Sequence, residues 1–590
     1  MGAGNMARTS VTGWMVVFLL TGVSMSEASA QSFVAGVPTQ ISVAPNNTAP
    51  DSDSDDPVLA PNANLVVFKS SASNLVSDDT NQVADIFVRG ADGVVTRQSI
   101  SSEGVQANQH SRDPAVTQRE PNGSYGIAFV SGASNLVPGL TAEDSQHAQV
   151  YLRLPHLKKT ILISRGYPES QSVAGSGQSG RPTVASLDGG AKYLVAFQSD
   201  AFNLVKGAGY SGPTGKKYKR IYFATVNPKT ETVELRAFIG KDDVQAEGDL
   251  MDPFLSGFGD NMVFRTDATN MGWPMAAAMV NSSYQVALAR KDGGIELISK
   301  SPIDGSTGLG SSESASMSFN ASRIVFKTAA FNIFEGSSLS PSIVAYDVNT
   351  KEYKLVNSTD TKVRGNGNSY DTVRLDPQGR LAVFMDTSDN YTLPGVDTNQ
   401  QADVFVKDLK TLKITRINLG AGGVQETDGY AGTPVLGTLG YNSQIAAVSF
   451  YSSSTILRQV GSGYIRNVYR SLLTFPPPPL DSTTKIESPP DVRPSAPRTL
   501  LLVLQKFDTS TASSALGSVD KLSTKLSYDV RVTRTTTGKQ RKVTSTKNRL
   551  TLRNLTPGQY TVKYRVSGKA TTGKKVRTRF SPSQTVTVTK

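Results

Sequence analysis

The chain of 590 residues contains no cysteine, three histidines and two tryptophans. The lack of cysteine excludes a disulfide scaffold, a cysteine nucleophile, thiolate zinc sites and a lipid anchor attached through a thiol. Three histidines leave little material for histidine-rich metal sites or proton relays. The chain also has no HExxH, GxSxG or P-loop pattern, so the commonest hydrolase and nucleotide-binding signatures are missing.

Long hydrophobic runs are missing after residue 30. Before it, Arg8 precedes the apolar segment Trp14–Val23, and small residues occupy positions 28–30. This pattern predicts a secretory signal peptide over residues 1–30, cleaved after Ala30. The apolar segment is shorter than the roughly 20 residues of a membrane span. Export without cysteine predicts a bacterial periplasmic or extracellular protein with no transmembrane segment.

A repeat of about sixty residues dominates the rest of the chain. A short apolar strand ending in phenylalanine recurs at intervals of 61, 68, 67, 62, 58 and 66 residues. The seven residues are Phe68, Phe129, Phe197, Phe264, Phe326, Phe384 and Phe450. Large apolar residues at strand ends are normally buried, so we expect these phenylalanines in the core.

Two polar positions follow the phenylalanine at fixed offsets. Serine or threonine stands two residues later in six copies, with Asp386 as the exception. Asparagine stands six residues later in six copies: Asn74, Asn135, Asn203, Asn270, Asn332 and Asn390. Ile456 takes that place in the seventh copy. A catalytic group is expected once rather than six times, so we interpret the asparagines as backbone-binding turn residues.

Each copy has alternating strand and turn signals and almost no helical periodicity, which predicts an all-β unit of about four strands. Repeated four-stranded units at this period describe propeller blades. The seventh copy lacks its last strand, whereas residues 39–44 resemble a last strand but precede the first copy. We therefore predict a seven-bladed β-propeller over residues 31–475, closed by this N-terminal strand in the blade of Phe450.

A more specific resemblance lies in the segment Phe68–Arg89, which reads FxSxAxNLVxxDTNxxADIFVR and is echoed at residues 397–405. It resembles the PD40 (WD40-like) repeats of bacterial TolB-type propellers. The resemblance implies a propeller fold and an exported bacterial setting. It implies no reaction, because members of such folds do many things.

The C-terminal part has a different composition. Residues 476–497 are rich in proline, which predicts an extended linker. Residues 498–590 read as a small β-sandwich, and the segment Leu555–Val562 resembles the tyrosine corner of fibronectin type III domains, with a Leu-to-Tyr spacing one residue shorter than usual. The early-strand tryptophan of that family is absent. The resemblance implies a fibronectin type III-like domain.

Positive charge is concentrated in this sandwich. It has 20 Lys+Arg and 3 acidic residues, a net charge of 20 − 3 = +17. The remaining chain has 61 − 20 = 41 basic and 49 − 3 = 46 acidic residues, a net charge of −5. Strand alternation predicts that six cations share one outward face. They are Arg531, Lys563, Arg565, Lys575, Arg577 and Arg579. We expect this face to bind anionic polymers of the cell envelope or medium and to lack aromatic side chains.

Two loops place oxygen-bearing side chains at alternate positions, as calcium ligation requires. One holds Asp79, Asn81 and Asp85, and the other Asp397, Asn399 and Asp403. The loops lack the glycine and closing glutamate of an EF-hand. The alternative is that these side chains stabilise the turns through their own backbone. Calcium is the one cofactor that the sequence suggests, and it suggests no other.

Other chemistry-bearing residues are scattered. Asp252, Asp386 and Asp389 could converge at the propeller mouth as a glycosidase carboxylate pair, whose separation a sequence does not reveal. The histidines His110, His147 and His156 have no partnering motif, so we interpret them as surface or loop residues. Trp273 could stack on a sugar or be buried.

Two functions remain open from the sequence. The first, which we favour, is a non-catalytic exported binding or scaffold protein, which we expect to be a monomer. Its propeller binds a protein or glycan, while the basic sandwich attaches to anionic surface polymers. The second is a propeller carbohydrate-active enzyme, a glycoside hydrolase or lyase, with an accessory sandwich domain. The absence of a catalytic constellation and the uneven charge favour the first.

Overall fold

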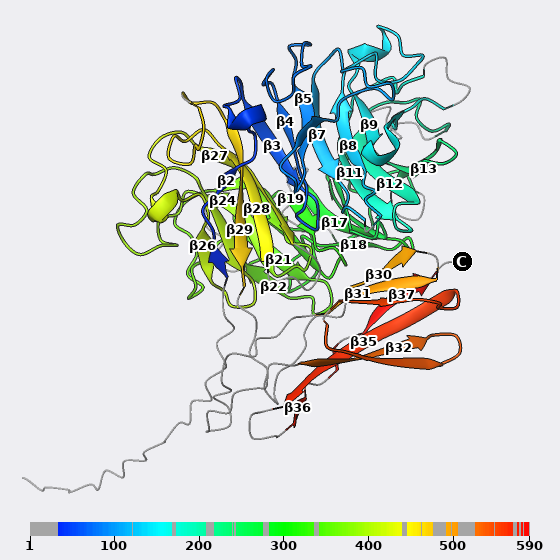
Figure 1. The fold of residues 1–590 in the computed structure, drawn as a ribbon. Helices are drawn as coiled ribbons and strands as arrows, with labels where there is room; N and C mark the ends of the chain where they lie inside the picture. The colour runs from blue at the N-terminus through cyan, green and yellow to red at the C-terminus, as the bar shows by residue number, and fades with distance from the viewer. Residues whose placement is uncertain are drawn as a thin grey trace, which may run out of the picture.

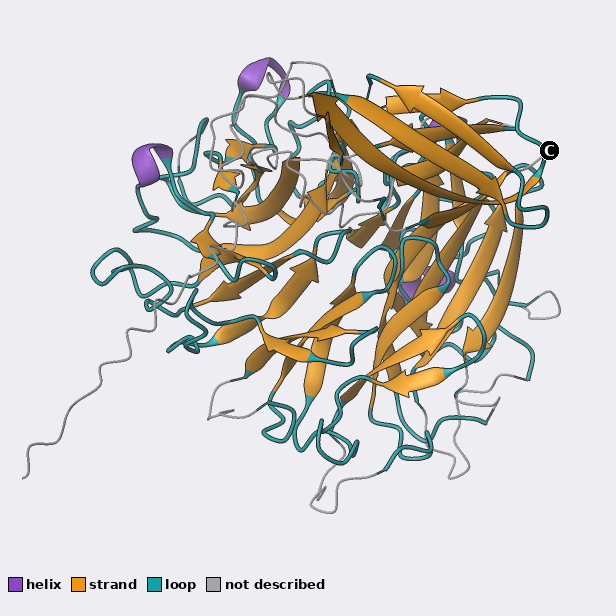
Figure 2. Ribbon diagram, turned by 90° about the horizontal axis from the view of Figure 1, so that it is seen from below, coloured by secondary structure: helices purple, strands orange, loops and turns teal. Residues whose placement is uncertain are grey.

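The computed structural model describes residues 33–475, apart from 121, 168–172, 208–217, 239, 241–243, 275–282, 335–340, 439–444 and 462, and residues 491–588, apart from 497, 505–525, 548, 570–574, 578–579 and 582. Strands and loops make up nearly all of this part (Figure 2). Helix occurs there only as short 3-10 turns: η1 (Pro45–Asn47), η2 (Asp144–Gln146), η3 (Pro155–Leu157) and η5 (Ala421–Gly423). The all-β class is confirmed. No helix within these ranges is long and apolar enough to cross a membrane.

Seven antiparallel sheets follow one another along the described chain between residues 34 and 474 (Figure 1). The first is β3 (Ser54–Leu59), β4 (Val66–Ser70), β5 (Asp85–Arg89), β6 (Val95–Arg97); the second β7 (Ser111–Val116), β8 (Ile127–Ser131), β9 (Gln149–Leu154), β10 (Lys159–Leu162); the third β11 (Ser179–Leu187), β12 (Lys192–Ser199), β13 (Arg220–Asn227), β14 (Thr232–Phe238). The fourth is β15 (Leu250–Leu255), β16 (Asn261–Thr266), β17 (Gln285–Arg290), β18 (Ile295–Leu297); the fifth β19 (Ser312–Met317), β20 (Arg323–Thr328), β21 (Ser342–Asp347), β22 (Tyr353–Leu355); the sixth β23 (Ser369–Leu375), β24 (Leu381–Asp386), β25 (Asp403–Asp408), β26 (Ile414–Arg416). The seventh is β27 (Ala431–Thr438), β28 (Ile445–Ser452) and β29 (Asn467–Thr474).

Two short N-terminal strands lie on the outer side of this seventh sheet. β1 (Val34–Ala35) and β2 (Thr39–Gln40) both pair antiparallel with β29, with Thr39 opposite Arg470. The backbone bonding continues one residue further, since the N–H of Ile41 donates to the carbonyl of Val468 at 2.7 Å. The segment expected as a strand over 39–44 is therefore a regular strand only at its start.

The first strands of the seven sheets form a circle. Each one contacts the first strand of the next sheet, and β27 contacts β3. Sheets arranged radially in this way make a β-propeller, in which the first strands surround the centre and later strands lie progressively outward.

The repeated phenylalanines occupy the cores of the sheets, as expected. All seven have a relative exposure of 0 %. In several sheets the ring stacks on the aromatic residue directly opposite on the third strand, as in Phe68–Phe87 and Phe129–Tyr151, with ring centroids 5.9 and 5.7 Å apart. Cross-strand aromatic pairs of this kind stabilise a sheet beyond the area they bury.

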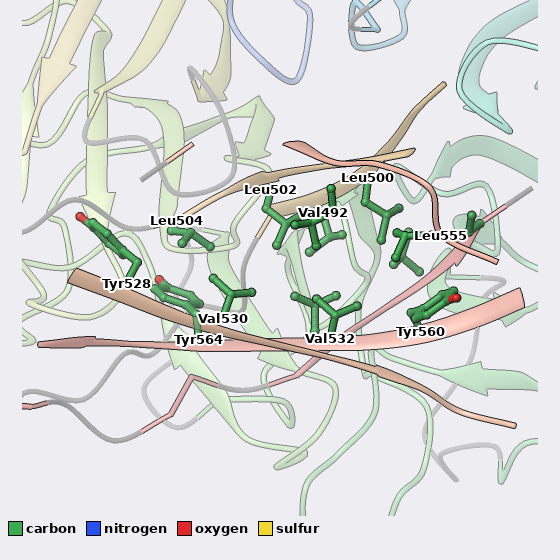
Figure 3. Packing of buried hydrophobic residues seen from close by; sticks show 14 of the residues in the cluster. Val492, Leu500, Leu502, Leu504, Tyr528, Val530, Val532, Leu555, Tyr560 and Tyr564 are labelled. Carbon is green, nitrogen blue, oxygen red and sulfur yellow. The ribbon is translucent and has the colours of Figure 1, made fainter. Parts of the chain in front are cut away.

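The C-terminal unit is a sandwich of two antiparallel sheets. One is β30 (Asp491–Ala496), β31 (Thr499–Val503) and β34 (Arg549–Leu552). The other is β33 (Gln540–Ser545), β32 (Ser527–Arg534), β35 (Gly558–Lys569) and β36 (Lys575–Arg577), with β37 (Gln584–Val588) also on β35. Its core joins Leu500 and Leu502 of the first sheet to Val530, Val532 and Tyr564 of the second (Figure 3).

One boundary differs from the sequence interpretation. Residues 491–496, assigned to the proline-rich linker, form β30 and pair with β31 through contacts such as Val492 with Leu502. Pro494 lacks an N–H, but β30 is an edge strand of its sheet, where a missing donor is tolerated. The sandwich therefore begins near residue 491 rather than 498.

Candidate functional site

The innermost strands of the propeller share a feature that the sequence analysis missed. Each has a β-bulge, seen as a register shift against the second strand. Six of the bulged residues have positive φ angles between 40° and 56°: Asp56, Asp113, Arg181, Asp252, Ser314 and Thr433. A bulge re-aims its side chain, and bulges are frequent next to functional sites. The recurring dipeptides Asp56-Pro57, Asp113-Pro114 and Asp252-Pro253 were the available signal.

Charged side chains at and beside these bulges form ion pairs around the centre. On one side, Lys69 lies 2.8 Å from Asp55 and 3.2 Å from Asp56, and Arg466 lies 2.8 Å from Asp55. On another side, Arg265 lies 2.8 Å from Asp252. The carboxylates at the centre are thus engaged by cations rather than held as a free catalytic pair.

Arg265 extends this pairing along the ring of first strands. Its guanidinium lies 3.4 Å from the carboxylate of Glu313, which Lys327 approaches to 3.1 Å. Arg181 lies 3.7 Å from Asp252, the same carboxylate that Arg265 binds. Cations therefore outnumber described carboxylates in this sector, which contains Arg181, Arg265, Lys327, Asp252 and Glu313.

The three acids considered as a possible glycosidase pair lie in different surroundings. Only Asp252 lies at a first-strand bulge. Asp386 is buried beside Ser369, Ser388 and Tyr391, and it accepts a 2.8 Å bond from the backbone N–H of Ser388. Asp389 is exposed and accepts a bond from Asn366. Each of the three carboxylates is thus bound to partners of its own rather than to a shared site.

The first calcium candidate loop holds an arginine among its carboxylates. Arg97 lies 3.1 Å from Asp79 and 3.6 Å from Asp85. Asn81 turns its Nδ2 donor toward Asp85 at 2.8 Å and toward the carbonyl of Ala107 at 2.9 Å. Burial and the charge of Asp85, partly offset by the charge of Arg97, raise the pKa of Asp79 to about 6.

The second loop repeats this arrangement. Arg416 lies 3.1 Å from Asp397 and 2.9 Å from Asp403, and Asn399 donates to the carbonyl of Glu426 at 2.7 Å. An amide donor and a guanidinium at the centre of the loop favour the turn-stabilising alternative over an oxygen cage for calcium. Within the described residues, no group of three or more acidic or histidine side chains is arranged to hold a metal ion.

Glu426 is a buried carboxyl that the sequence analysis did not single out. It is 3 % exposed, and both its oxygens lie 3.2 Å from the hydroxyl of Ser452. Burial, with a further contribution from the charge of Asp403, raises its pKa to about 8. At neutral pH this carboxyl is therefore largely protonated.

The repeated asparagines have the structural role expected of them. In each of the six copies the side chain donates to one backbone carbonyl and accepts from the N–H two residues later in the loop that precedes the first strand. Asn203, for example, donates to Ala174 at 3.0 Å and accepts from Ser176 at 2.7 Å. The other five make the same two bonds. The asparagine thus joins the loop leaving one sheet to the sheet that follows.

The histidines and the tryptophan lie in separate places. His110 accepts a 2.9 Å bond from the backbone N–H of Ala84, and His156 lies in the turn η3. Trp273 packs, partly buried, against the core around Phe264.

His147 lines a cavity of about 480 Å³ between loops of the second, third and fourth sheets. The cavity is also lined by Ser176, Gly177, Gln178, Asp200, Phe202, Tyr218, Lys219 and Asp249. Phe202 is 58 % exposed. The lining thus combines an exposed aromatic ring with two carboxylates and a histidine. Ligand-binding sites combine aromatic and polar side chains in this way.

The outer face of the sandwich carries the predicted cations that the structure describes. Tyr528, Val530 and Val532 of β32 are buried, so Arg531 points outward between the two valines. Lys563 of β35 lies directly opposite Arg531. Lys542 of β33, which the prediction did not include, lies opposite Arg531 on its other side. Neighbouring strands are about 4.8 Å apart, so three cations stand in one row across three strands.

An aromatic ring lies on this face, contrary to expectation. The guanidinium carbons of Arg531 and Arg565 lie 4.2 and 4.8 Å from the centroid of Phe580, and the ammonium of Lys563 lies 5.4 Å away. The expectation of a face without aromatic side chains assumed that strand alternation continues to Phe580, but β36 ends at Arg577. Asp529 lies 3.2 Å from Arg565 and partly neutralises it.

Other predicted residues lie outside the described part. These are the side chains of Lys575 and Arg577, the whole of Arg579, and the cleavage site at Ala30.

Among known proteins, this chain resembles solved structures in fold only. No family model matches the chain, and no curated protein matches it. An oligogalacturonate lyase from Vibrio parahaemolyticus has 11 % identity and a TM-score of 0.40 over 76 % of this chain and 97 % of that one. The β-propeller domain of the trilobed protease from Pyrococcus furiosus has 11 % identity and a TM-score of 0.38 over 72 % and 94 %. A TolB-like structure from Agrobacterium tumefaciens has 11 % identity and a TM-score of 0.29 over 55 % and 83 %. Such similarities assign no activity to this chain.

Proposed function

We propose that the protein is an exported, non-catalytic binding protein whose sandwich attaches it to anionic polymers of the cell surface or medium. The propeller is then the platform that presents a protein or glycan ligand site. Export is proposed from the apolar segment Trp14–Val23 and the small residues before position 31, which lie outside the described residues.

The row of cations on the outer sandwich face carries this proposal. Arg531 lies directly between Lys542 and Lys563 on the two neighbouring strands. Like charges placed directly opposite on a sheet are destabilising. The described acid on this face, Asp529, pairs with Arg565 and not with the row. A sheet that retains such repulsion is best explained by an anionic partner that relieves it.

Phe580 adds to the suitability of this face. The ring holds the three cations Arg531, Lys563 and Arg565 near one point through cation–π attraction. Side chains ordered in this way lose less entropy when they bind an anion. We expect binding through charge, without strong sequence or sugar specificity, that weakens steeply with salt as counterions are released.

The test is retention of the full-length mature protein on immobilised heparin, used as a polyanion probe. The variant Arg531→Gln/Lys542→Gln/Lys563→Gln is expected to elute at clearly lower salt than the wild type. The control Lys229→Gln/Lys291→Gln/Lys362→Gln removes the same charge from exposed propeller positions and is expected to elute close to the wild type. Equal loss of retention in both variants would show a net-charge effect and no dedicated face.

We also propose a finer architecture for both units. The propeller has seven blades, and β1 and β2 complete the last one; the pairing of both strands with β29 and the contact of β27 with β3 support this. The sandwich is of the fibronectin type III kind. Its strand orders β30-β31-β34 and β33-β32-β35 support this, as does the 2.7 Å bond from the Tyr560 hydroxyl to the carbonyl of Thr556.

A carbohydrate-active propeller enzyme is the second candidate. The cavity with His147, Asp200, Asp249 and exposed Phe202 favours it, because aromatic and carboxylate side chains are common in sugar sites. Incubation of the full-length protein with a panel of polysaccharides tests it. Turnover that is lost in Asp200→Asn or Asp249→Asn would replace the non-catalytic proposal.

A further inference from the structure

Arg374 is a charged residue at a position that is uncharged in the other sheets. On the first strand of each sheet, one residue pairs with the residue that precedes the repeated phenylalanine. Six of the seven are uncharged: Val58, Ala115, Thr183, Phe254, Ser316 and Val435. In the sixth sheet it is Arg374, opposite Val383. A shared packing role does not explain an arginine there.

The guanidinium of Arg374 reaches toward strands that are not its neighbours. Its carbon lies 5.8 Å from the ring centroid of Phe254, which belongs to the fourth sheet, with the fifth sheet between them in chain order. Its Nη1 donates to the carbonyl of Val373 at 2.9 Å. Among the described residues no carboxylate oxygen lies within 4.0 Å of it.

The surroundings of Arg374 are electrostatically unfavourable for a cation. Burial and the charge of Arg181, partly offset by the charge of Asp252, lower the pKa of Arg374 to about 10. Asp252 is already held by Arg265 at 2.8 Å. Arg374 therefore stays protonated at neutral pH, and a mostly buried cation without a full counter-charge costs stability.

We propose that the centre of the propeller binds an oxyanion, a carboxylate or a phosphate group, between Arg374 and Arg181. Both guanidinium groups lie against β15, that of Arg374 beside Phe254 and that of Arg181 3.7 Å from Asp252. The Arg181 side chain is 66 % exposed and held at a bulge with φ +50°, so its guanidinium is accessible. Guanidinium groups bind carboxylate and phosphate oxygens through two parallel N–H donors. The site is separate from the basic sandwich face, so it extends the proposed function by giving the propeller ligand an acidic group.

The test titrates phosphate and, in a separate arm, acetate into the full-length protein at constant ionic strength, up to about 10 mM, a range too dilute for general salt exclusion to dominate. Melting temperature and calorimetric heat are both measured. We expect one or both anions to raise the melting temperature of the wild type. The arm with the larger shift distinguishes a phosphate ligand from a carboxylate ligand. Arg374→Gln is expected to weaken the binding by at least about tenfold.

The matched control is Arg531→Gln/Lys542→Gln/Lys563→Gln, which removes the row of cations on the sandwich and is expected to keep the shift. Arg374→Met provides a second measurement. Without added anion it is expected to melt no lower than the wild type, because it removes a partly buried charge that has only an incomplete counter-charge. An unchanged response in Arg374→Gln, or no response of the wild type to either anion, would overturn the proposal. Heparin retention of Arg374→Gln separates this outcome from a failure of the sandwich face.

Discussion

The hydroxyl oxygen of Ser42 accepts a 3.0 Å hydrogen bond from the backbone N–H of Val468, although the two residues are 426 positions apart in the sequence. Other sheets make the equivalent bond from the third strand to a side chain just after the fourth. The donor and acceptor pairs are Ile86 and Ser99, Val150 and Ser164, Val286 and Ser299, Ile343 and Asn357, and Val404 and Asn418. Ser42 thus provides to the seventh sheet what a local residue provides elsewhere.

This relationship predicts that the N-terminal segment stabilises the whole propeller. Deletion of residues 33–44 is expected to lower the free energy of unfolding by several kcal/mol, because it removes several buried contacts and leaves the edge of the seventh sheet unpaired. Ser42→Ala is expected to cost about 1–3 kcal/mol, because the N–H of Val468 is buried. Denaturant unfolding measures both, and Val37→Ala, at a residue 55 % exposed, is the control. An unchanged free energy of unfolding in the deletion variant would refute a closing role.

The asparagine that joins adjacent sheets gives a second prediction. Asn203→Ala is expected to cost about 1–3 kcal/mol, because it removes the bond that Asn203 donates to the carbonyl of Ala174 and the bond that it accepts from the N–H of Ser176. Thermal melting compares it with Asn349→Ala, an exposed residue that is expected to change little. Equal stability of the two variants would argue that the repeated asparagine has another role.

The arginines of the DTN loops give a third prediction. Arg416→Met is expected to cost about 3–5 kcal/mol, because it leaves Asp397 and Asp403 as unpaired buried carboxylates. Arg112→Met, which breaks an exposed ion pair with Asp113, is expected to cost less than about 1 kcal/mol. Melting curves measure the difference between them.

Calcium can be tested through the first of these loops. Arg97 and a calcium ion would compete for the same oxygens of Asp79 and Asp85. If the loop can hold calcium, the ion should raise the melting temperature of Arg97→Met more than that of the wild type. The absence of any calcium effect on either protein would leave the turn-stabilising interpretation alone.

Glu426 predicts a pH dependence of stability. Its pKa of about 8 in the folded state lies well above the ordinary value near 4.5. The folded protein therefore holds a proton that the unfolded chain releases, and the stability that this proton contributes is complete below pH 4.5 and is lost as the pH rises to about 8. Glu426→Gln removes this loss, and its advantage over the wild type should grow by about 2–4 kcal/mol between pH 5 and pH 8.

Urea unfolding at several pH values measures this advantage. Glu234→Gln, at an exposed position, is the control and should show no such growth. A constant difference between Glu426→Gln and the wild type across the range would show that Glu426 does not hold a proton in the folded protein.

The sequence alone determined the repeating part of this protein. Each sheet buries the same kind of residue and makes the same loop contact. Phe68 and its six equivalents, and Asn74 and its five, therefore recur at fixed offsets, and the pattern itself indicates their roles. The alternation of Val530, Arg531 and Val532 likewise placed one cation on the outer face of the sandwich, because side chains in a strand alternate between faces whatever surrounds them.

Only the tertiary structure decided which distant residues meet. Arg374 lies near Phe254, Glu426 lies near Asp403 and Ser452, and Phe580 lies under Arg531 because separate sheets or strands bring them together. No local period encodes such meetings. Burial and charge at these points depend on the sum of all neighbours, which a residue's own sequence context does not contain. The regular strands were therefore readable from the sequence, whereas the central charge cluster and the buried carboxyl were not.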